Sequence, residues 1–341
     1  MNERERARYS RQILFAPLGE EGQQRLLASR AVVVGCGALG SFHVDALARS
    51  GVGEIRVIDR DYVEESNLQR QWLFDEADAA QALPKSVAAQ RKIAAVASSI
   101  RIDAVVEDLH AGNAESLLSG FNVILDGTDN FETRYLINDF AIKHKTPWIY
   151  GAAVGSYGLV MPVLPGRGAC LRCVFRDPPE GPHESCDTAG VLNAVTAWTA
   201  SLQVADAIKL LSGNADAVRL NLTSNDVWRG EARSISVDRP SPDCPCCVQG
   251  LYASLEARGR RREAILCGRD AVQIPSDGRT LVLEDLRKKL EPLGEVRANQ
   301  YALRFYSPPH EITVFSDGRA IIKGAAKVEI ARSLYARYVG G

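Results

Sequence analysis

The sequence lacks several features that would set it apart from ordinary globular proteins. Charge of neither sign is in excess, since 41 lysines and arginines stand against 42 aspartates and glutamates. This balance gives no reason to expect a nucleic-acid or membrane partner. The sequence has no uncharged run long enough to span a bilayer, and its charged start, MNERERARYSRQ, has no apolar core of the secretory type. We therefore expect a cytoplasmic protein.

The length and composition are those of a globular chain with more than one core. Of the 341 residues, 46% are apolar and 24% are charged. Strand and helix patterns alternate over residues 1–250, which predicts an α/β domain with a Rossmann-like, mostly parallel sheet and helices on both faces. We expect a charged linker at 251–263 and a small α+β domain over 264–341. The pattern of that domain is a strand, a helix, two or three strands and a last helix.

Four of the eight cysteines stand in two C-x-x-C pairs, Cys170 with Cys173 and Cys244 with Cys247. This spacing favours metal binding in a reducing compartment over a disulfide framework. Four thiolates form a closed, structural Zn²⁺ site with no open position for catalysis. Two redox pairs are the alternative, but neither pair opens a helix of a thioredoxin-like unit. Within CPCC only the outer two cysteines keep the spacing, so we expect Cys246 to stand outside the set.

A glycine motif lies between the first predicted strand and its helix. Gly35, Gly37 and Gly40 form G-x-G-x-x-G in VVVGCGALGS. Their missing side chains let the backbone approach a phosphate at the helix N-terminus. Asp59 ends the next strand, 19 residues beyond Gly40, where a carboxylate can accept hydrogen bonds from ribose hydroxyls. Taken alone, this pattern would predict an NAD-dependent oxidoreductase.

The residues that follow indicate a nucleoside triphosphate instead. Arg70 in SNLQRQ and Lys85 in LPKS supply cations soon after the ribose carboxylate. Asp129 in DGTDN follows the predicted strand NVIL and therefore lies at the carboxyl edge of the sheet, where open α/β folds bind ligands. Cations for phosphates and a carboxylate for Mg²⁺ suit nucleotidyl transfer, and hydride transfer needs neither.

Several motifs in register carry a resemblance to a known family. They are RYSRQI, VVVGCGALGS, DRDYVEESNLQRQ, PKSVAA, DGTDNFETRYLIND, CLRC, SCDTAGV, SLQVADAIKLL and DCPCC. In this order and spacing the chain resembles the ThiF/MoeB family of sulfur-carrier-protein adenylyltransferases, relatives of the ubiquitin-activating enzymes. The resemblance covers about residues 8 to 250.

The resemblance implies an enzyme that binds ATP and Mg²⁺ and adenylates the C-terminal glycine of a small ubiquitin-like carrier protein ending in Gly-Gly. Pyrophosphate is the other product. The implied roles are ribose binding by Asp59, phosphate binding by Asn67, Arg70 and Lys85, and Mg²⁺ binding by Asp129. Arg11 of RYSRQI would reach the phosphates from the partner subunit of a homodimer. The chain has no rhodanese-like cysteine loop, so sulfur would come from a separate donor, a cysteine desulfurase or a rhodanese.

Cys186 is left without a partner among the cysteine pairs. It precedes TAGV, where we expect the long helix to begin, and a helix N-terminus favours the thiolate. The resemblance implies that this thiol attacks the carrier's acyl adenylate or joins the carrier through a sulfur linkage, although some family members adenylate without using it. His183 is expected to be a solvated loop residue. Arg134 is a weaker candidate for phosphate binding, since an arginine on its helix could merely pair with Asp139 or face solvent. We expect Cys36 to be a buried packing residue.

The sequence leaves the pathway open. The C-terminal region resembles a tail found on some ThiF-type proteins, which favours thiamine biosynthesis over molybdopterin biosynthesis. An NAD-dependent oxidoreductase is a weaker alternative, because no proton-relay residue stands near a nicotinamide site. A non-catalytic relative that only docks a carrier would be expected to have lost Arg70, Lys85 or Asp129, and all three are present.

Overall fold

The structure, a computed structural model, describes residues 1–177, 189–257, 264–266, 271–275, 279–325 and 327–340. The chain divides into two compact units, Met1–Arg258 and Gly259–Gly341. Within the described residues, no helix is both long enough and apolar enough to cross a membrane.

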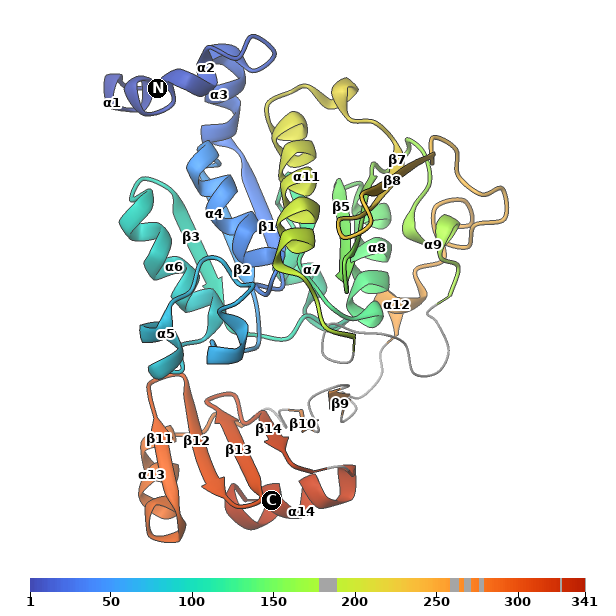
Figure 1. The fold of residues 1–341 in the computed structure, drawn as a ribbon. Helices are drawn as coiled ribbons and strands as arrows, with labels where there is room; N and C mark the ends of the chain where they lie inside the picture. Colours follow the sequence, from blue (N-terminus) through green and yellow to red (C-terminus); the bar gives the residue numbers. More distant parts are fainter. Residues whose placement is uncertain (178–188, 258–263, 267–270, 276–278, 326, 341) are drawn as a thin grey trace. The chain divides into compact units, whose positions relative to one another are not determined.

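The first unit is built on one eight-stranded sheet in the order β3-β2-β1-β4-β5-β6-β7-β8 (Figure 1). The strands from β3 to β5 in this order are parallel, and β6, β7 and β8 continue the sheet antiparallel. Their bounds are β1 Arg30–Val34, β2 Glu54–Ile58, β3 Arg101–Val105, β4 Val123–Asp126, β5 Trp148–Val154, β6 Tyr157–Val163, β7 Asn221–Asp226 and β8 Glu231–Ser236. This is the predicted mostly parallel α/β sheet.

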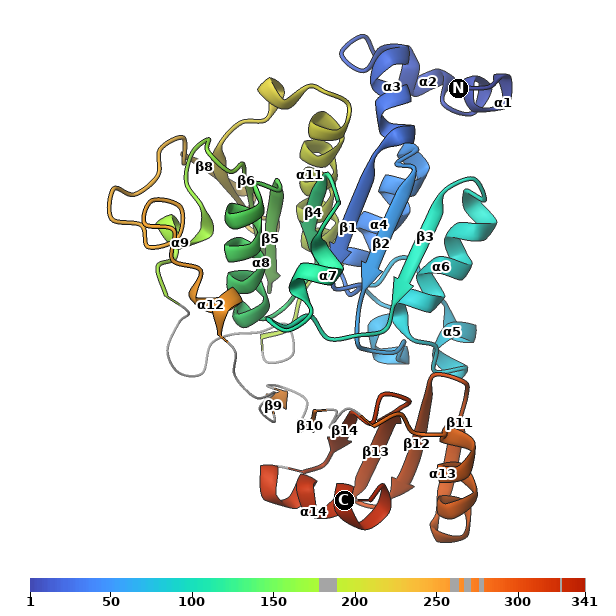
Figure 2. The ribbon, with the colours of Figure 1, turned by 180° about the vertical axis from the view of Figure 1, so that it is seen from behind.

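Helices cover both faces of the parallel strands, which is why RAVVV and VILD contain continuous runs of apolar residues rather than alternating ones. On one face α4 (Gly40–Ser50), α6 (Lys85–Val96) and α11 (Asn193–Leu211) pack against side chains such as Val33 and Leu125. On the other face α7 (Ala114–Leu118) and α8 (Phe131–His144) pack against side chains such as Val32 and Ile124 (Figure 2).

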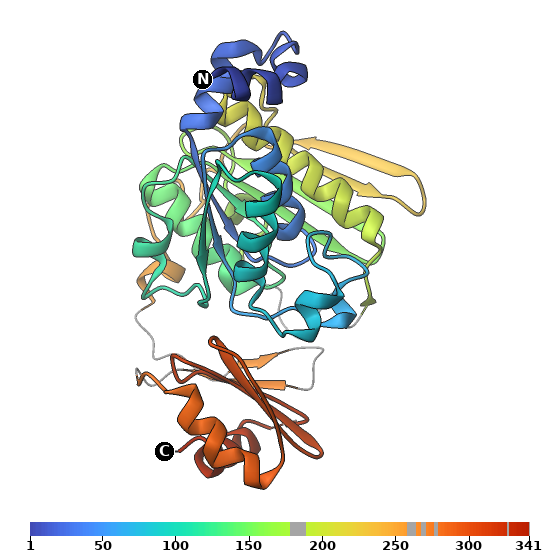
Figure 3. The ribbon, with the colours of Figure 1, turned by 90° about the vertical axis from the view of Figure 1, so that its left-hand side faces the viewer.

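Other helices of the first unit lie at the two ends of the parallel strands (Figure 3). Three helices precede β1 and lie beyond the amino ends of these strands: α1 (Glu3–Arg8), α2 (Ser10–Ile13) and α3 (Gly19–Ala28). The 3₁₀ turn η1 (Glu65–Asn67) and α5 (Glu76–Ala80) follow β2 and lie at the carboxyl ends. Two more short helices, α9 (Leu171–Val174) and α12 (Ala253–Glu256), flank the cysteine pairs.

The order of the strands reverses at β1. The chain runs outward through β2 and β3 and returns to place β4 on the other side of β1. In open α/β sheets this reversal opens a crevice at the carboxyl ends of the two strands. Gly35 follows β1 and Gly127 follows β4, and the Gly127 amide donates to the Val34 carbonyl at 2.8 Å. The glycine motif and DGTDN therefore meet at the reversal.

The second unit holds a six-stranded antiparallel sheet in the order β11-β12-β13-β14-β10-β9. Its elements are β9 Ala264–Leu266, β10 Ala271–Ile274, α13 Leu283–Leu290, β11 Glu295–Ala298, β12 Ala302–Ser307, β13 His310–Phe315, β14 Ala320–Lys323 and α14 Val328–Tyr338. Two strands precede α13 and four follow it, so the predicted numbers were too low. Only Pro308 and Pro309 separate β12 from β13, a turn too short to show in the sequence pattern.

Candidate functional site

The glycine loop between β1 and α4 is shaped by contacts of its own backbone. Gly35 has a φ of 83°, and a Cβ there would lie 2.6 Å from the Gly127 carbonyl oxygen. A Cβ at Gly40 would lie 1.8 Å from the Gly35 carbonyl oxygen. Gly37 differs, because the nearest atom to its added Cβ would be Gln71 Nε2, 4.0 Å away. Gly35 and Gly40 thus close the loop, and Gly37 leaves space beside it.

Asp59 ends β2 and is tied to this loop. One carboxylate oxygen accepts from the Cys36 amide at 2.5 Å, and the other accepts from the Asp61 amide at 2.6 Å. Burial raises the pKa of Asp59, and the nearby Lys85 ammonium opposes that rise. A carboxylate oxygen that accepts one hydrogen bond can accept another. Cys36 itself is fully buried in the core, as predicted for a packing residue.

Lys85 is the first residue of α6 and is almost fully buried. Its Nζ lies 3.3 Å from an oxygen of Asp61, whose carboxylate is only partly exposed. The structure therefore brings Lys85, Asp59 and Asp61 together at the carboxyl edge of the sheet. The sequence pattern gave Lys85 a place near the ribose carboxylate but did not show Asp61 as its partner.

The segment SNLQRQ lines the same edge after β2. Asn67 is buried, and its side-chain oxygen accepts from the Glu64 amide at 3.3 Å. Arg70 is partly exposed and donates to the Ser66 carbonyl at 3.0 Å, which leaves other N–H groups of its guanidinium available. Gln71 is buried, and its side-chain oxygen has no hydrogen-bond partner in the described part of the chain.

Asp129 is exposed in the loop after β4, at the strand reversal. Its charge acts on Arg60, which donates to Asp108 at 3.1 Å. Burial lowers the pKa of Arg60, but the carboxylates of Asp108, Asp61 and Asp129 outweigh that effect and the pKa lies above its usual value. Exposed carboxylate oxygens such as those of Asp129 are the ligands that a hard metal ion prefers.

Arg134 on α8 does not lie where the sequence analysis expected. It is buried, its Nε is 3.3 Å from Asp126, and it donates to the carbonyls of Thr128 at 2.7 Å and Gly151 at 3.2 Å. The expected pairing with Asp139 or exposure to solvent is wrong, because the first turn of α8 presents Arg134 to the sheet. Arg134 and Asp126 together brace the loop that carries Asp129.

A second buried polar group, missed by the sequence analysis, supports the site from α11. The Gln203 amide donates to the carbonyls of Asp126 and Ile149, both at 2.9 Å, and its oxygen lies 2.9 Å from His43 Nε2. Since the Gln203 nitrogen is the donor, its oxygen accepts and His43 carries its proton on Nε2. Burial lowers the pKa of His43 to about 4. The only sequence signal was a glutamine within an otherwise apolar stretch of helix.

The two cysteine pairs converge on one point. The sulfur atoms of Cys170, Cys173, Cys244 and Cys247 all lie within 4.8 Å of one another, and neighbouring sulfurs are 3.4 to 3.8 Å apart. Sulfurs at about 2.3 Å from a tetrahedral zinc would be about 3.8 Å apart, so the cluster fits such an ion. Cys246 stands outside the set as predicted, and its sulfur accepts from Asn138 Nδ2 at 3.4 Å.

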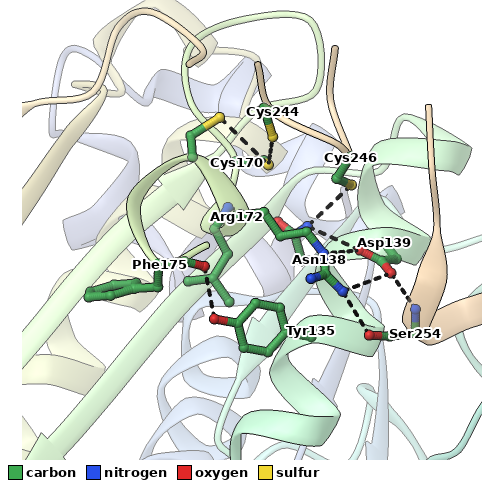
Figure 4. Close-up of polar contacts among 11 residues, drawn as sticks. Tyr135, Asn138, Asp139, Cys170, Arg172, Phe175, Cys244, Cys246 and Ser254 are labelled. Atoms are coloured by element: carbon green, nitrogen blue, oxygen red, sulfur yellow. Dashed lines mark hydrogen bonds and ion pairs between the residues drawn. The ribbon is translucent and has the colours of Figure 1, made fainter. Parts of the chain in front are cut away.

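Two adjacent residues of α8 hold the cysteine segments in place (Figure 4). Asn138 accepts from the Leu171 amide at 2.8 Å. Asp139 is fully buried, pairs with Arg172 at 3.0 Å and accepts from the Ser254 amide at 2.8 Å. The helix that begins at the Asp129 loop therefore also anchors α9 and α12, the elements on either side of the cysteine cluster.

Arg11 lies far from this edge. It is exposed on α2, and the described residues offer it no hydrogen bond or ion pair. Cys186 and His183 lie outside the described residues. The long helix after them, α11, begins at Asn193 rather than at the predicted TAGV.

The chain was compared with known proteins. The model of the ThiF family matches residues 9–246. The sulfur carrier protein ThiS adenylyltransferase of Bacillus subtilis is 41% identical over 98% of this chain and 99% of that protein. The SAMP-activating enzyme E1 of Haloferax volcanii is 36% identical over 73% of this chain and 91% of that protein. A crystal structure of E. coli MccB with ATP matches 70% of this chain and 74% of that one, with a TM-score of 0.62 and 24% identity, which shows a shared fold.

The chain belongs to the ThiF family. This confirms the family predicted from the sequence. The enzyme class in the relatives' names, adenylyltransferase, is also the one that the motifs predict.

Proposed function

We propose that this chain adenylates the C-terminal glycine of a ubiquitin-like sulfur carrier protein of the ThiS type and serves thiamine biosynthesis. The observation that carries the choice of carrier is the match to the Bacillus subtilis ThiS adenylyltransferase, which spans both units of the chain. Molybdopterin biosynthesis is the second candidate. The adenylyltransferase and sulfurtransferase MOCS3 of Bos taurus supports it less well, because the match covers 70% of this chain and 52% of that protein.

The carboxyl edge of the sheet offers groups suited to each part of ATP. The glycine loop and the amino end of α4 present backbone amides to phosphate, with open space beside Gly37. Asp59 is fixed by two amides and can accept from ribose hydroxyls. Asn67, Arg70 and Lys85 line the same edge, and the positive charge of the last two would offset the charge of the triphosphate.

Asp129 would hold Mg²⁺ in this proposal. Its exposed carboxylate oxygen is the hard ligand that this ion prefers, and the ion usually completes its coordination with phosphate oxygens and water. Bound there, Mg²⁺ would neutralise charge on the pyrophosphate leaving group. Arg134 and Asp126 hold the Asp129 loop in place through hydrogen bonds to the backbone of Thr128.

The reaction needs no covalent help from the protein in its first step. An oxygen of the carrier's C-terminal carboxylate attacks the α-phosphorus, the bond from that phosphorus to the bridging oxygen breaks, and pyrophosphate leaves. The cations offset the repulsion between the two anionic reactants, and the fixed edge of the sheet orients them.

Four further parts of the proposal concern partners, the thiol of Cys186 and a metal. Arg11 would act on the site of the second subunit in a homodimer, and a cysteine desulfurase or rhodanese would donate sulfur. The thiolate of Cys186 would attack the carbonyl carbon of the acyl adenylate, forming a thioester while the bond to the phosphate oxygen breaks and AMP leaves. The four-cysteine cluster would hold a structural Zn²⁺, because four thiolates leave no position open for catalysis.

Carrier-dependent exchange of labelled pyrophosphate into ATP tests the activity. We expect exchange with a ThiS-type carrier and none with a carrier that lacks its C-terminal glycines. Asp129→Ala should lower the exchange rate at least about a hundredfold, because one metal or oxyanion contact is worth about 2.7–4 kcal/mol. Asp108→Asn, which removes a neighbouring carboxylate charge at the same edge, is the matched control and should retain exchange. Normal exchange by a folded Asp129→Ala would remove Asp129 from the site.

A further inference from the structure

A buried side-chain amide borders the open space beside the glycine loop. Gln71 is 3% exposed, and its side-chain amide forms no hydrogen bond within the described part of the chain. Gln71 Nε2 is the nearest atom to a Cβ added at Gly37, at 4.0 Å, whereas a Cβ at Gly35 or Gly40 would clash with backbone. The amide nitrogen of Gln71 therefore faces the gap that Gly37 leaves.

The burial of this amide is costly without a ligand. Its oxygen and its two N–H groups are removed from water, and no protein group among the described residues replaces the lost hydrogen bonds. Nearly all buried polar side chains in folded proteins have a hydrogen-bond partner, so an exception calls for an explanation. A ligand that places an acceptor atom in the gap beside Gly37 would supply the missing partner.

The turn that carries Gln71 is already fixed in the chain without ligand. The backbone amide of Gln71 donates to the Asn67 carbonyl at 3.0 Å, and the Phe74 amide donates to the Gln71 carbonyl at 3.2 Å. Phe74 is buried in the core of the first unit, and Leu68 and Leu73 pack against that core. Because the backbone on both sides of Gln71 is held, binding through its side chain costs little further ordering of the chain.

The gap is suited to an anion. The Gly37 carbonyl accepts from the Ser41 amide at 3.0 Å, so Gly37 lies one turn before α4, an 11-residue helix whose amino end favours negative charge. In loops of the form G-x-G-x-x-G, the second glycine lets the backbone approach a phosphate. An N–H donor on the opposite side of the gap completes the surroundings of such a group. Gln71 provides this donor without placing another buried positive charge beside Lys85.

We propose that the side-chain amide of Gln71 donates a hydrogen bond to the phosphate of ATP that lies against Gly37. The assignment rests on the proposed function, because it takes ATP as the ligand of this edge of the sheet. It adds to the site a neutral phosphate-binding residue that stands next to Arg70 in the chain. The role of Gln71 is to bind and orient the phosphate, and no covalent step involves it.

Binding of ATP with Mg²⁺ to the full chain, measured by calorimetric titration without a carrier, tests the contact. Gln71→Met keeps the length of the side chain and removes the amide. We expect this variant to raise the Kd for ATP at least about tenfold, because a hydrogen bond to a charged group is lost. Gln71→Glu should weaken binding further, since a carboxylate would face the phosphate. Gln69→Met is the matched control, because Gln69 is an exposed glutamine of the same segment, and it should bind ATP like the wild type.

Adenosine separates a phosphate contact from a structural role. Because adenosine has no phosphate, its inhibition constant as a competitor of ATP should change less than about twofold in Gln71→Met. Thermal melting of the ligand-free variants checks their folding. Wild-type affinity for ATP in a folded Gln71→Met, or an equal loss of affinity for ATP and adenosine, would overturn the proposal. A wild type that binds ATP but exchanges no pyrophosphate with any carrier would contradict the proposed function alone, since the binding test uses no carrier.

Discussion

At the scale of single residues, the site depends on buried polar groups that hydrogen-bond to the strands from which its loops emerge. Gln203 reaches from α11 to the last residue of β4 and to β5, and leaves no room for a side chain at position 151. A Cβ on Gly151 would lie 2.4 Å from the Gln203 amide. His43 completes the group, and its environment strongly favours the neutral imidazole.

His43 makes the stability of the first unit depend on pH. Its pKa is about 4 in the folded chain and about 6.5 when unfolded, so the unfolded state binds the proton more readily. The stabilisation is present above pH 6.5 and is lost as the pH falls toward 4, by about 3 kcal/mol in all. We expect His43→Gln, which keeps a donor for Gln203, to flatten the fall of the free energy of unfolding over this range. Denaturant unfolding of both proteins at pH 7, 6, 5 and 4 measures this. If the free energy of unfolding fell equally with pH in the wild type and in His43→Gln, the assignment would be wrong.

The residues differ in how far the sequence could place them. Asp59 and Asp129 were placed at or just after strand ends, because apolar runs mark where these strands stop. Arg134 was misplaced, since the direction of a helical side chain depends on how the helix turns toward the sheet. Gln203 could not be recognised, because its partners are backbone carbonyls of strands more than fifty residues away in the chain.

At the scale of elements, the parallel strands and their helices follow from long apolar patterns, and the predicted βαβ order is the order observed. The strands of the second unit were undercounted, because their turns are short and several of the strands have only four residues. Convergence of the cysteine pairs was predictable from spacing alone. Their attachment to α8 was not, since Asn138 and Asp139 act through backbone amides and an arginine distant in sequence.

The cysteine cluster predicts a coupling between metal content and stability. Cys247→Ser should lower the zinc content below one ion per chain and lower the melting temperature, because metal binding at a structural site contributes to folding. Cys246→Ser is the matched control, being the adjacent thiol outside the cluster, and should keep the zinc. Cys186→Ser should also keep zinc and form the acyl adenylate, but lose any covalent carrier adduct. Elemental analysis of the purified variants decides the point: full zinc in Cys247→Ser would refute the assignment.

At the scale of the whole molecule, the two units carry different weight in the proposed reaction. The groups proposed for ATP and metal all lie in Met1–Arg258. The match to the Haloferax volcanii relative covers 73% of this chain and 91% of that protein. That relative therefore has little sequence beyond the part that this chain matches. The second unit is therefore expected to serve something other than adenylation.

Truncation after Arg258 tests this division. We expect residues 1–258 to exchange pyrophosphate into ATP at a rate within about threefold of the full chain at saturating carrier, because every proposed contact to the reacting groups remains. The carrier concentration needed for half-maximal exchange is measured in the same assay. A folded truncated chain with no exchange would show that the second unit completes the site.

The meeting of the two glycine turns also restricts how this chain can drift in evolution. Positions 35, 40 and 127 each stand against another backbone, with an added Cβ at 2.6, 1.8 and 2.4 Å from a carbonyl oxygen. A smaller side chain at a neighbouring residue cannot compensate for a substitution at one of these positions, because the added Cβ would clash with backbone atoms. A descendant that carries any other residue there must have rebuilt the turns that follow β1 and β4. In a genome survey, a related chain without one of these glycines should therefore not be assumed to have kept the nucleotide site.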